Sequence, residues 1–219
     1  MNLPTLMNEG DYRAQFGLTG QMAINNGSNL QLVLAEPRIT KRAFIKEETA
    51  LNKTTEFYPD KYWHILDDGR VQCDVCPRFC KLHEGQQGLC FVRGRRGNRI
   101  MLTSYGRSSG FCIDPIEKKP LNHFLPSTSV LSFGTAGCNL ACKFCQNWDM
   151  SKSREMDILA NEASPLKLAQ MAHEMGFRSI AYTYNDPVIF MEYAMDVAAA
   201  CREYEIKSVA VTAGYICNE

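Results

Sequence analysis

Apolar and polar positions follow a strand–helix rhythm from residue 129 onward. The apolar run 130–133 predicts a buried strand, and residues 179–184 and 207–212 predict two more. The segments between these strands are long enough for helices, so we expect right-handed crossovers and a parallel sheet. In a sheet of this kind, catalytic residues belong at the carboxyl ends of the strands.

Two helices are predicted in this part of the chain. The first begins at Pro165, after the capping residue Ser164, and ends at Gly176, which is the usual placement of proline and glycine in helices. The second begins at Asp186 and Pro187. Its predicted inner face consists of Ile189, Phe190, Tyr193, Ala194, Val197, Ala198 and Cys201.

The chain before residue 129 divides into two parts. Residues 1–57 have sparse, irregular apolar positions, with a turn-rich break at 25–29. Within this part, residues 29–35 predict a strand and residues 42–51 a short helix, and we interpret the whole as an N-terminal extension of uncertain order. Residues 58–128 form a small cysteine-rich lobe, and residues 129–219 carry the strand–helix pattern.

Composition narrows the class of protein. The 219 residues have no net formal charge, which argues against a strongly cationic binder of nucleic acid or membrane surfaces. No stretch approaches the roughly 20 apolar residues that span a bilayer, and residues 1–10 lack a secretory signal pattern. Ten cysteines would suit a secreted disulfide scaffold, but here they fall into groups with metal-ligand spacing. We therefore expect a cytoplasmic protein.

The strongest chemical signal is the loop directly after the first predicted strand. Cys138, Cys142 and Cys145 have the spacing C-x3-C-x2-C. A [4Fe–4S] cluster held by three thiolates is one protein ligand short of the usual set, and its open iron would accept an outside ligand, much as catalytic zinc does. A zinc knot or three merely buried thiols is the alternative. The motif contains no histidine, however, and buried thiols need no turn-type spacing among polar neighbours.

At this loop the chain resembles the radical S-adenosylmethionine (radical SAM) superfamily, whose loop after the first barrel strand reads C-x3-C-x-aromatic-C. Phe144 fills the aromatic place. Further runs are similar to one branch, the radical SAM member of the AmmeMemoRadiSam system, which is often labelled as similar to pyruvate formate-lyase activating enzyme. These runs are residues 115–121 (PIEKKPL), 145–148 (CQNW), 183–187 (TYNDP) and 211–215 (VTAGY), and the resemblance covers about residues 60–219.

The resemblance implies a mechanism. Cys138, Cys142 and Cys145 would bind three irons, and the fourth iron would take the amino and carboxylate groups of S-adenosylmethionine. An electron from a reductant such as flavodoxin or ferredoxin would cleave the sulfonium, which gives methionine and a 5′-deoxyadenosyl radical that abstracts a hydrogen atom. The substrate, either a protein or a small molecule, is not indicated. The protein would supply orientation and the exclusion of competing reactions.

Other residues receive roles through the same resemblance. Phe144 would border the adenine. Asn185 and Asp186 occupy the place where the superfamily contacts the methionine amino group, usually through a Gly-Gly-Glu-like motif that this chain lacks. An acidic group there would pair with the ammonium, and Asp186 would also cap the following helix. Thr212 and Gly214 would approach the ribose or the methionine.

A second cysteine group lies in the lobe. Cys73, Cys76 and Cys80 are followed by Cys90 after a glycine-rich turn, and this spacing can close a four-ligand cage. Small glycine-rich lobes seldom hold together without such a staple. Structural zinc and a second iron–sulfur cluster fit the pattern about equally well. Four reduced thiols without a metal are the alternative.

Three further groups of residues carry less weight. The nearby arginines are interpreted as a solvated turn, because nothing else supports nucleic-acid binding. They are Arg93, Arg95, Arg96 and Arg99. Cys112 stands alone and is interpreted as structural, and three histidines give no catalytic signal, namely His83, His123 and His173.

These features predict an α/β fold: a partial (β/α) barrel of the radical SAM type with a small N-terminal cysteine-rich lobe. The radical SAM core usually has six strand–helix units, whereas this chain stops after its third strand and would leave an unpaired parallel edge. We therefore expect a fragment of a longer protein. Two other function classes compete: an iron–sulfur electron carrier with four closed ligands per cluster, and a zinc-stapled module without catalysis.

Overall fold

The computed structural model describes residues 22–25, 29–32, 58–59, 61–152 and 161–217. The chain forms two compact units, Met1–Thr54 and Thr55–Glu219. In the first unit, β1 (Met22–Asn25) pairs antiparallel with β2 (Asn29–Leu32). The predicted strand at 29–35 is thus confirmed where it is described, and the predicted helix at 42–51 lies outside the described residues.

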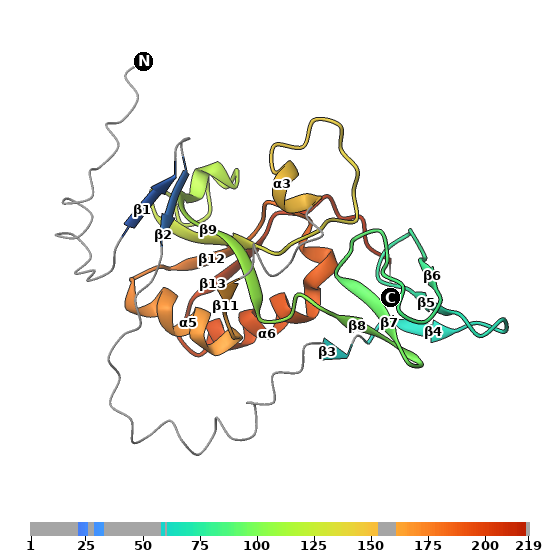
Figure 1. Ribbon diagram of the computed structural model, residues 1–219. Coiled ribbons are helices and arrows are strands. Elements are labelled where there is room, and N and C mark those ends of the chain that lie inside the picture. The colour runs from blue at the N-terminus through green and yellow to red at the C-terminus, as the bar shows by residue number, and fades with distance from the viewer. Residues whose placement is uncertain (1–21, 26–28, 33–57, 60, 153–160, 218–219) are drawn as a thin grey trace. The chain divides into compact units, whose positions relative to one another are not determined.

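A five-stranded mixed sheet organises the second unit, in the order β11-β9-β10-β12-β13 (Figure 1). Its parallel strands are the three predicted ones, which are confirmed with small differences at their ends: β10 (Ser129–Gly134) is one residue longer at each end, and β12 (Ser179–Tyr182) and β13 (Lys207–Ala210) each end two residues earlier. On the other side of β10, β9 (Arg107–Pro115) runs antiparallel to it, and β11 (Asn161–Glu162) extends the sheet beyond β9. Residues 107–115, assigned above to the cysteine-rich lobe, therefore pair directly with the first parallel strand.

The two long helices of the second unit lie against one face of this sheet (Figure 1). α5 (Pro165–Glu174) begins as predicted, because the Ser164 hydroxyl accepts a hydrogen bond from Lys167 N at 3.3 Å. The second predicted helix begins with a 3₁₀ turn, η2 (Pro187–Phe190), and continues as α6 (Met191–Arg202). Both connections cross on the same side, as right-handed crossovers between parallel neighbours require.

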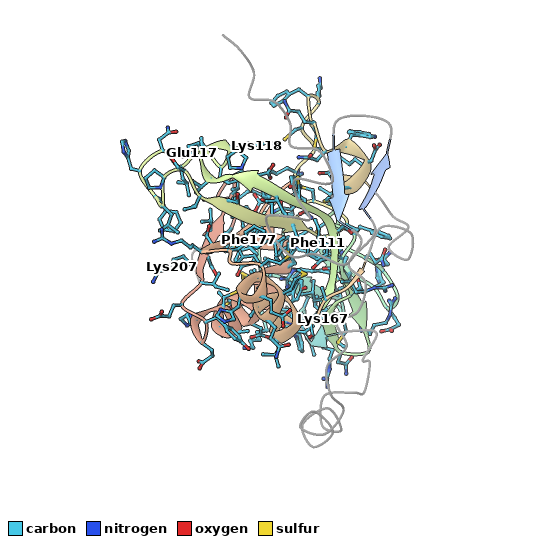
Figure 2. The ribbon with its side chains drawn as sticks, turned by 90° about the vertical axis from the view of Figure 1, so that its left-hand side faces the viewer. Phe111, Glu117, Lys118, Lys167, Phe177 and Lys207 are labelled. Carbon is cyan, nitrogen blue, oxygen red and sulfur yellow. The ribbon has the colours of Figure 1, made fainter. Side chains whose placement is uncertain are left out.

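The two faces of the sheet carry different cores, because side chains alternate along a strand. The helix-side core joins residues of β10 and β12 to the inner sides of α5 and α6, and Figure 2 shows Phe111 and Phe177 within it. Its strand residues are Leu131, Phe133, Ile180 and Tyr182. The opposite face has a smaller core that consists of Ile116, Val130, Ala181 and Val209.

The cysteine-rich segment adds two small antiparallel sheets. One has the order β3-β8-β7 and the other β4-β5-β6. Their strands are β3 (Tyr58–Pro59), β4 (Trp63–Ile65), β5 (Val71–Cys73), β6 (Lys81–Leu82), β7 (Arg93–Arg96) and β8 (Arg99–Leu102). Two short turns complete the described elements, η1 (Ile116–Lys118) and α3 (Trp148–Ser151).

One expectation about this segment is wrong for Arg93. The arginine run was interpreted as a solvated turn, but Arg93 is only 2 % exposed. Its guanidinium pairs with the Glu192 carboxylate on α6, and its Nε donates to Ile189 O at 2.9 Å. Arg93 therefore attaches the β7–β8 hairpin to the helical side of the molecule.

Across the described part of the chain, no helix combines the length and apolarity that a bilayer crossing requires.

Candidate functional site

The loop after β10 carries the three cysteines of the strongest motif. Cys138 is buried, Cys142 and Cys145 are partly exposed, and all three thiols are free. Phe144 stands out from the loop with 88 % of its surface exposed. Among the described residues, no three Cys, His, Asp or Glu side chains form a group that could hold a metal ion. The structure thus brings the three thiols onto one loop but does not close them into a ligand set.

Asn185, at the exit of β12, holds the start of this loop. Its amide nitrogen donates to Thr135 O at 2.8 Å and Gly137 O at 2.7 Å, and its amide oxygen accepts from Thr135 N at 3.3 Å. The side chain is 5 % exposed, so these bonds are shielded from water. The close approach requires Gly134, because a Cβ there would lie 2.5 Å from Thr183 O. The first two parallel strands are therefore joined at their carboxyl ends.

The end of the loop is held by the neighbouring backbone. Asn147 Nδ2 donates to Tyr184 O at 2.9 Å, and the Cys145 sulfur lies 3.5 Å from the Ser151 hydroxyl on α3. Tyr184 has a φ of +74°, a left-handed conformation that is costly for a side chain of this size. This conformation lies within the 183–187 motif, directly before Asn185.

Asp186 links the exits of β12 and β13. Its Oδ1 accepts from Val188 N at 3.1 Å and from the Thr212 hydroxyl at 2.9 Å, and its Oδ2 accepts from Ala213 N at 3.0 Å. The predicted capping role is confirmed by the Val188 bond. Gly214 follows in a left-handed conformation, with φ +66°, and its N–H donates to the Thr212 hydroxyl at 2.9 Å. Asp186 therefore shapes the segment that contains both Thr212 and Gly214.

A buried polar cluster on β9 was not predicted as a site. Asp114 is 3 % exposed and accepts from Lys118 at 2.7 Å, from Lys119 at 2.5 Å and from the Tyr184 hydroxyl at 3.1 Å. Burial opposes its charge, but the two lysines outweigh burial and lower the pKa of Asp114 to about 2. Burial, together with nearby Cys112 and Asp114, raises the pKa of Tyr184. The 115–121 motif thus contributes its lysines to a contact with the 183–187 motif, which only the fold reveals.

The second cysteine group lines one pocket. The pocket walls also include Asn139 from the loop after β10 and Ile189 from η2. Burial raises the pKa of the Cys90 thiol to about 11, against the opposing effect of Arg93. The cysteines of this wall are Cys73, Cys76, Cys80 and Cys90, all of them free.

Comparison with known proteins identifies the domain that holds the strand-end loops. Residues 133–219 match the model of the Radical SAM superfamily. This part of the chain is a radical SAM domain. It begins within β10 and contains the cysteine loop and the exits of β12 and β13. Such a domain implies SAM-dependent radical chemistry and, in general, a [4Fe–4S] cluster with SAM. The donor set fits that cluster, because the three free thiols of the motif lie together on one loop.

A curated relative extends the similarity beyond this domain. The chain is 37 % identical over 158 residues to an uncharacterized protein of Methanocaldococcus jannaschii, which covers 72 % of this chain. The match covers 47 % of that protein, so the chain spans about half the length of the relative. No solved structure matches the chain.

Proposed function

We propose that the protein reductively cleaves S-adenosylmethionine at a [4Fe–4S] cluster held by Cys138, Cys142 and Cys145. The observation that carries this proposal is the C-x3-C-x-aromatic-C loop at the exit of the first parallel strand, inside the radical SAM domain. When bound, the cluster supplies the electron that splits the sulfonium into methionine and a 5′-deoxyadenosyl radical, which abstracts hydrogen from an unidentified substrate. A one-electron reductant such as flavodoxin or ferredoxin would reduce the cluster beforehand.

The chain's own residues prepare this site by holding the loop at both ends. Asn185 donates to Gly137 O at the start of the loop, and Asn147 at its end donates to Tyr184 O, so the thiol-bearing segment is anchored before a ligand arrives. Preorganisation of this kind lowers the cost of binding. Phe144 is exposed beside Cys145, where an adenine ring would cover it. We therefore retain Phe144 as the adenine neighbour.

Asp186 supports an ammonium contact within the same proposal. A carboxylate offers about four acceptor sites, and three internal donors use most of them. One acceptor site on Oδ2 remains for the amino group of SAM. Asn185 has both amide hydrogens engaged, so we assign it to holding the loop. Thr212 and Gly214 follow the third parallel strand, and we propose that this segment lines the ribose or the methionine.

Within the radical SAM superfamily, we place the protein in the branch of the AmmeMemoRadiSam system, which is similar to glycyl-radical activases. The support is the joint presence of the motifs at 115–121 and 183–187. These two motifs also meet in the fold, where Tyr184 donates to Asp114 beside Lys118 and Lys119. To test this placement, the substrate that the protein consumes should be identified and compared with that of a glycyl-radical activase, which acts on a glycine of a partner protein.

The experiment that tests the reaction is anaerobic reconstitution of the purified protein. We expect iron with acid-labile sulfide, an electron paramagnetic resonance signal that changes on addition of SAM, and release of methionine and 5′-deoxyadenosine after reduction. Cys142→Ala should lose the cluster signal, because two thiolates do not hold the cube, whereas the matched variant Cys112→Ala should keep it. Full cluster content in Cys142→Ala would overturn the ligand assignment. A cluster with four protein ligands and no response to SAM would indicate an electron carrier, and zinc alone would indicate a non-catalytic module.

A further inference from the structure

We propose that Cys73, Cys76, Cys80 and Cys90 form a four-thiolate zinc site, and that the bound zinc fastens the loops after β10 and β13 to the lobe. This site is separate from the three-cysteine loop. It does not depend on the radical SAM reaction proposed above. Four cysteines with short spacings are a common ligand set of structural zinc.

The four thiols surround one small pocket. Its wall is formed by the four cysteines together with residues of the neighbouring turns, among them Gly88 and Leu89. We choose zinc because four cysteines are a common ligand set of structural zinc, and the metal analysis below distinguishes it from a second iron–sulfur cluster.

Tight turns of the backbone bring these cysteines together. Cys73 N donates to Cys80 O at 3.0 Å, and Phe79 N donates to Cys76 O at 3.1 Å, so three cysteines lie on one reversed segment. Gly88 then lets the turn before Cys90 approach, because a Cβ at Gly88 would lie 3.4 Å from the Cys80 sulfur. The side chains do not form a closed ligand set in the described structure. Zinc binding must therefore rotate the cysteines about χ1 toward the ion.

The same lobe contacts the loop that carries Cys138. The position of Gly137 has no room for a side chain, because a Cβ there would lie 2.0 Å from Cys90 O. Arg78 Nε, two residues after Cys76, donates to Asn139 O at 3.3 Å. Asn139 is 1 % exposed and forms part of the pocket wall. An ion that orders the turns at Cys76 and Cys90 would thereby order the loop.

The segment after β13 is attached to the same turns. Asn139 Nδ2 donates to Tyr215 O at 3.1 Å, and Cys217 N donates to Val75 O at 3.0 Å. The Arg78 guanidinium also lies over the Tyr215 ring, 5.9 Å from its centroid. Zinc at the four thiols would therefore order two loops at the carboxyl edge of the sheet, although neither loop contributes a ligand to the zinc.

Metal analysis in a cluster-free background tests the site. In the variant Cys138→Ser/Cys142→Ser/Cys145→Ser, we expect about one equivalent of zinc per chain, as in structural zinc sites. Adding Cys76→Ser/Cys80→Ser should remove it, and adding Cys112→Ser instead should not. No zinc in the first variant, iron with sulfide in its place, or zinc retained without Cys76 and Cys80 would each overturn the proposal.

A second measurement uses the unmodified protein, so it does not depend on the folding of variants. With zinc bound, the four lobe cysteines should be alkylated about tenfold more slowly than after chelation, because metal-bound thiolates are withdrawn from reaction. Cys112 should be unaffected. Chelation should also speed hydrogen exchange at the Cys217 amide, but not at Leu131 within β10. Unchanged alkylation would overturn the site, and unchanged exchange would overturn its fastening role. Neither result depends on SAM or on the cluster.

Discussion

At the scale of single residues, Asp186 is the contact point of two strand ends. Three donors converge on its carboxylate, and two of them are backbone N–H groups, of Val188 and Ala213. Asp186→Asn would replace one oxygen by an NH₂ group, which would then face at least one of these N–H groups. Leaving a buried donor unsatisfied costs about 1–3 kcal/mol. Val188 is buried but Ala213 is exposed, so we expect the free energy of unfolding to fall by at most about that amount in urea titrations.

This result differs from the expectation for a helix cap alone, since Asn and Asp cap about equally well. Asp149→Asn is a matched control, because Asp149 is exposed on α3 and the charge change is the same. An exposed substitution should stay within about 0.5 kcal/mol. SAM affinity, measured separately by anaerobic titration, then reports the proposed ammonium contact. Equal stability of the wild type and Asp186→Asn would show that the hydrogen bonds to Asp186 contribute little.

Spacing along the chain predicted which residues lie at the site but not what they contact. Cys138, Cys142 and Cys145 are near neighbours in sequence, so their common loop was predictable. The partners of Asn185 lie about 50 residues earlier, at Thr135 and Gly137, and no local pattern connects them. The same holds for Arg93, whose burial depends on a carboxylate 99 residues away on α6.

At the scale of elements, the loop after β10 and the turn at Cys90 are packed with no spare space. Gly137 has a φ of +83°, and a Cβ there would lie 2.0 Å from Cys90 O. Gly137→Ala therefore adds a clash to backbone strain of about 1–3 kcal/mol, and we expect a larger loss of stability than strain alone produces. Reconstituted iron content should also fall, because the adjacent Cys138 must move.

Gly97 is the matched control for this change. It has a φ of +62° in the β7–β8 turn, and nothing lies within 4 Å of its Cβ position. Gly97→Ala should therefore show the conformational strain without the clash. Thermal unfolding of both variants separates the two effects. A loss no greater in Gly137→Ala than in Gly97→Ala would mean that the loop shifts away from Cys90 at little cost.

The elements themselves were predictable where one face is apolar. The three parallel strands and α5 follow the expected periodicity and capping. β9 was missed because the charged residue Asp114 interrupts its pattern, and the burial of Asp114 relies on lysines later in the chain. α3 has four residues, too few for a periodic signal.

At the scale of the second unit, a buried ion pair joins the cysteine-rich segment to the helices. The side chains of Arg93 and Glu192 are 2 % and 3 % exposed. Both charges are therefore shielded from water. Removing them from water has a large desolvation cost, which the attraction between the two charges offsets. The pair connects α6 with β7, which belongs to the small sheet β3-β8-β7. Together with the contacts of Arg78 and Gly137, it makes the lobe part of the same folding unit as the radical SAM domain.

Removal of one partner of this pair should be more damaging than removal of both. Arg93→Met leaves the Glu192 carboxylate in a buried site without its guanidinium, and we expect a loss of about 3–5 kcal/mol, whereas Arg93→Met/Glu192→Leu should recover most of it. Urea unfolding of Arg93→Met, Glu192→Leu and the double variant gives the coupling energy between the two sites. Arg70→Met, which breaks an exposed pair with Asp68, should change stability little. If the losses of the two single variants simply add up to the loss of the double variant, Arg93 does not fasten the lobe through Glu192, and its bond to Ile189 O would have to carry the attachment.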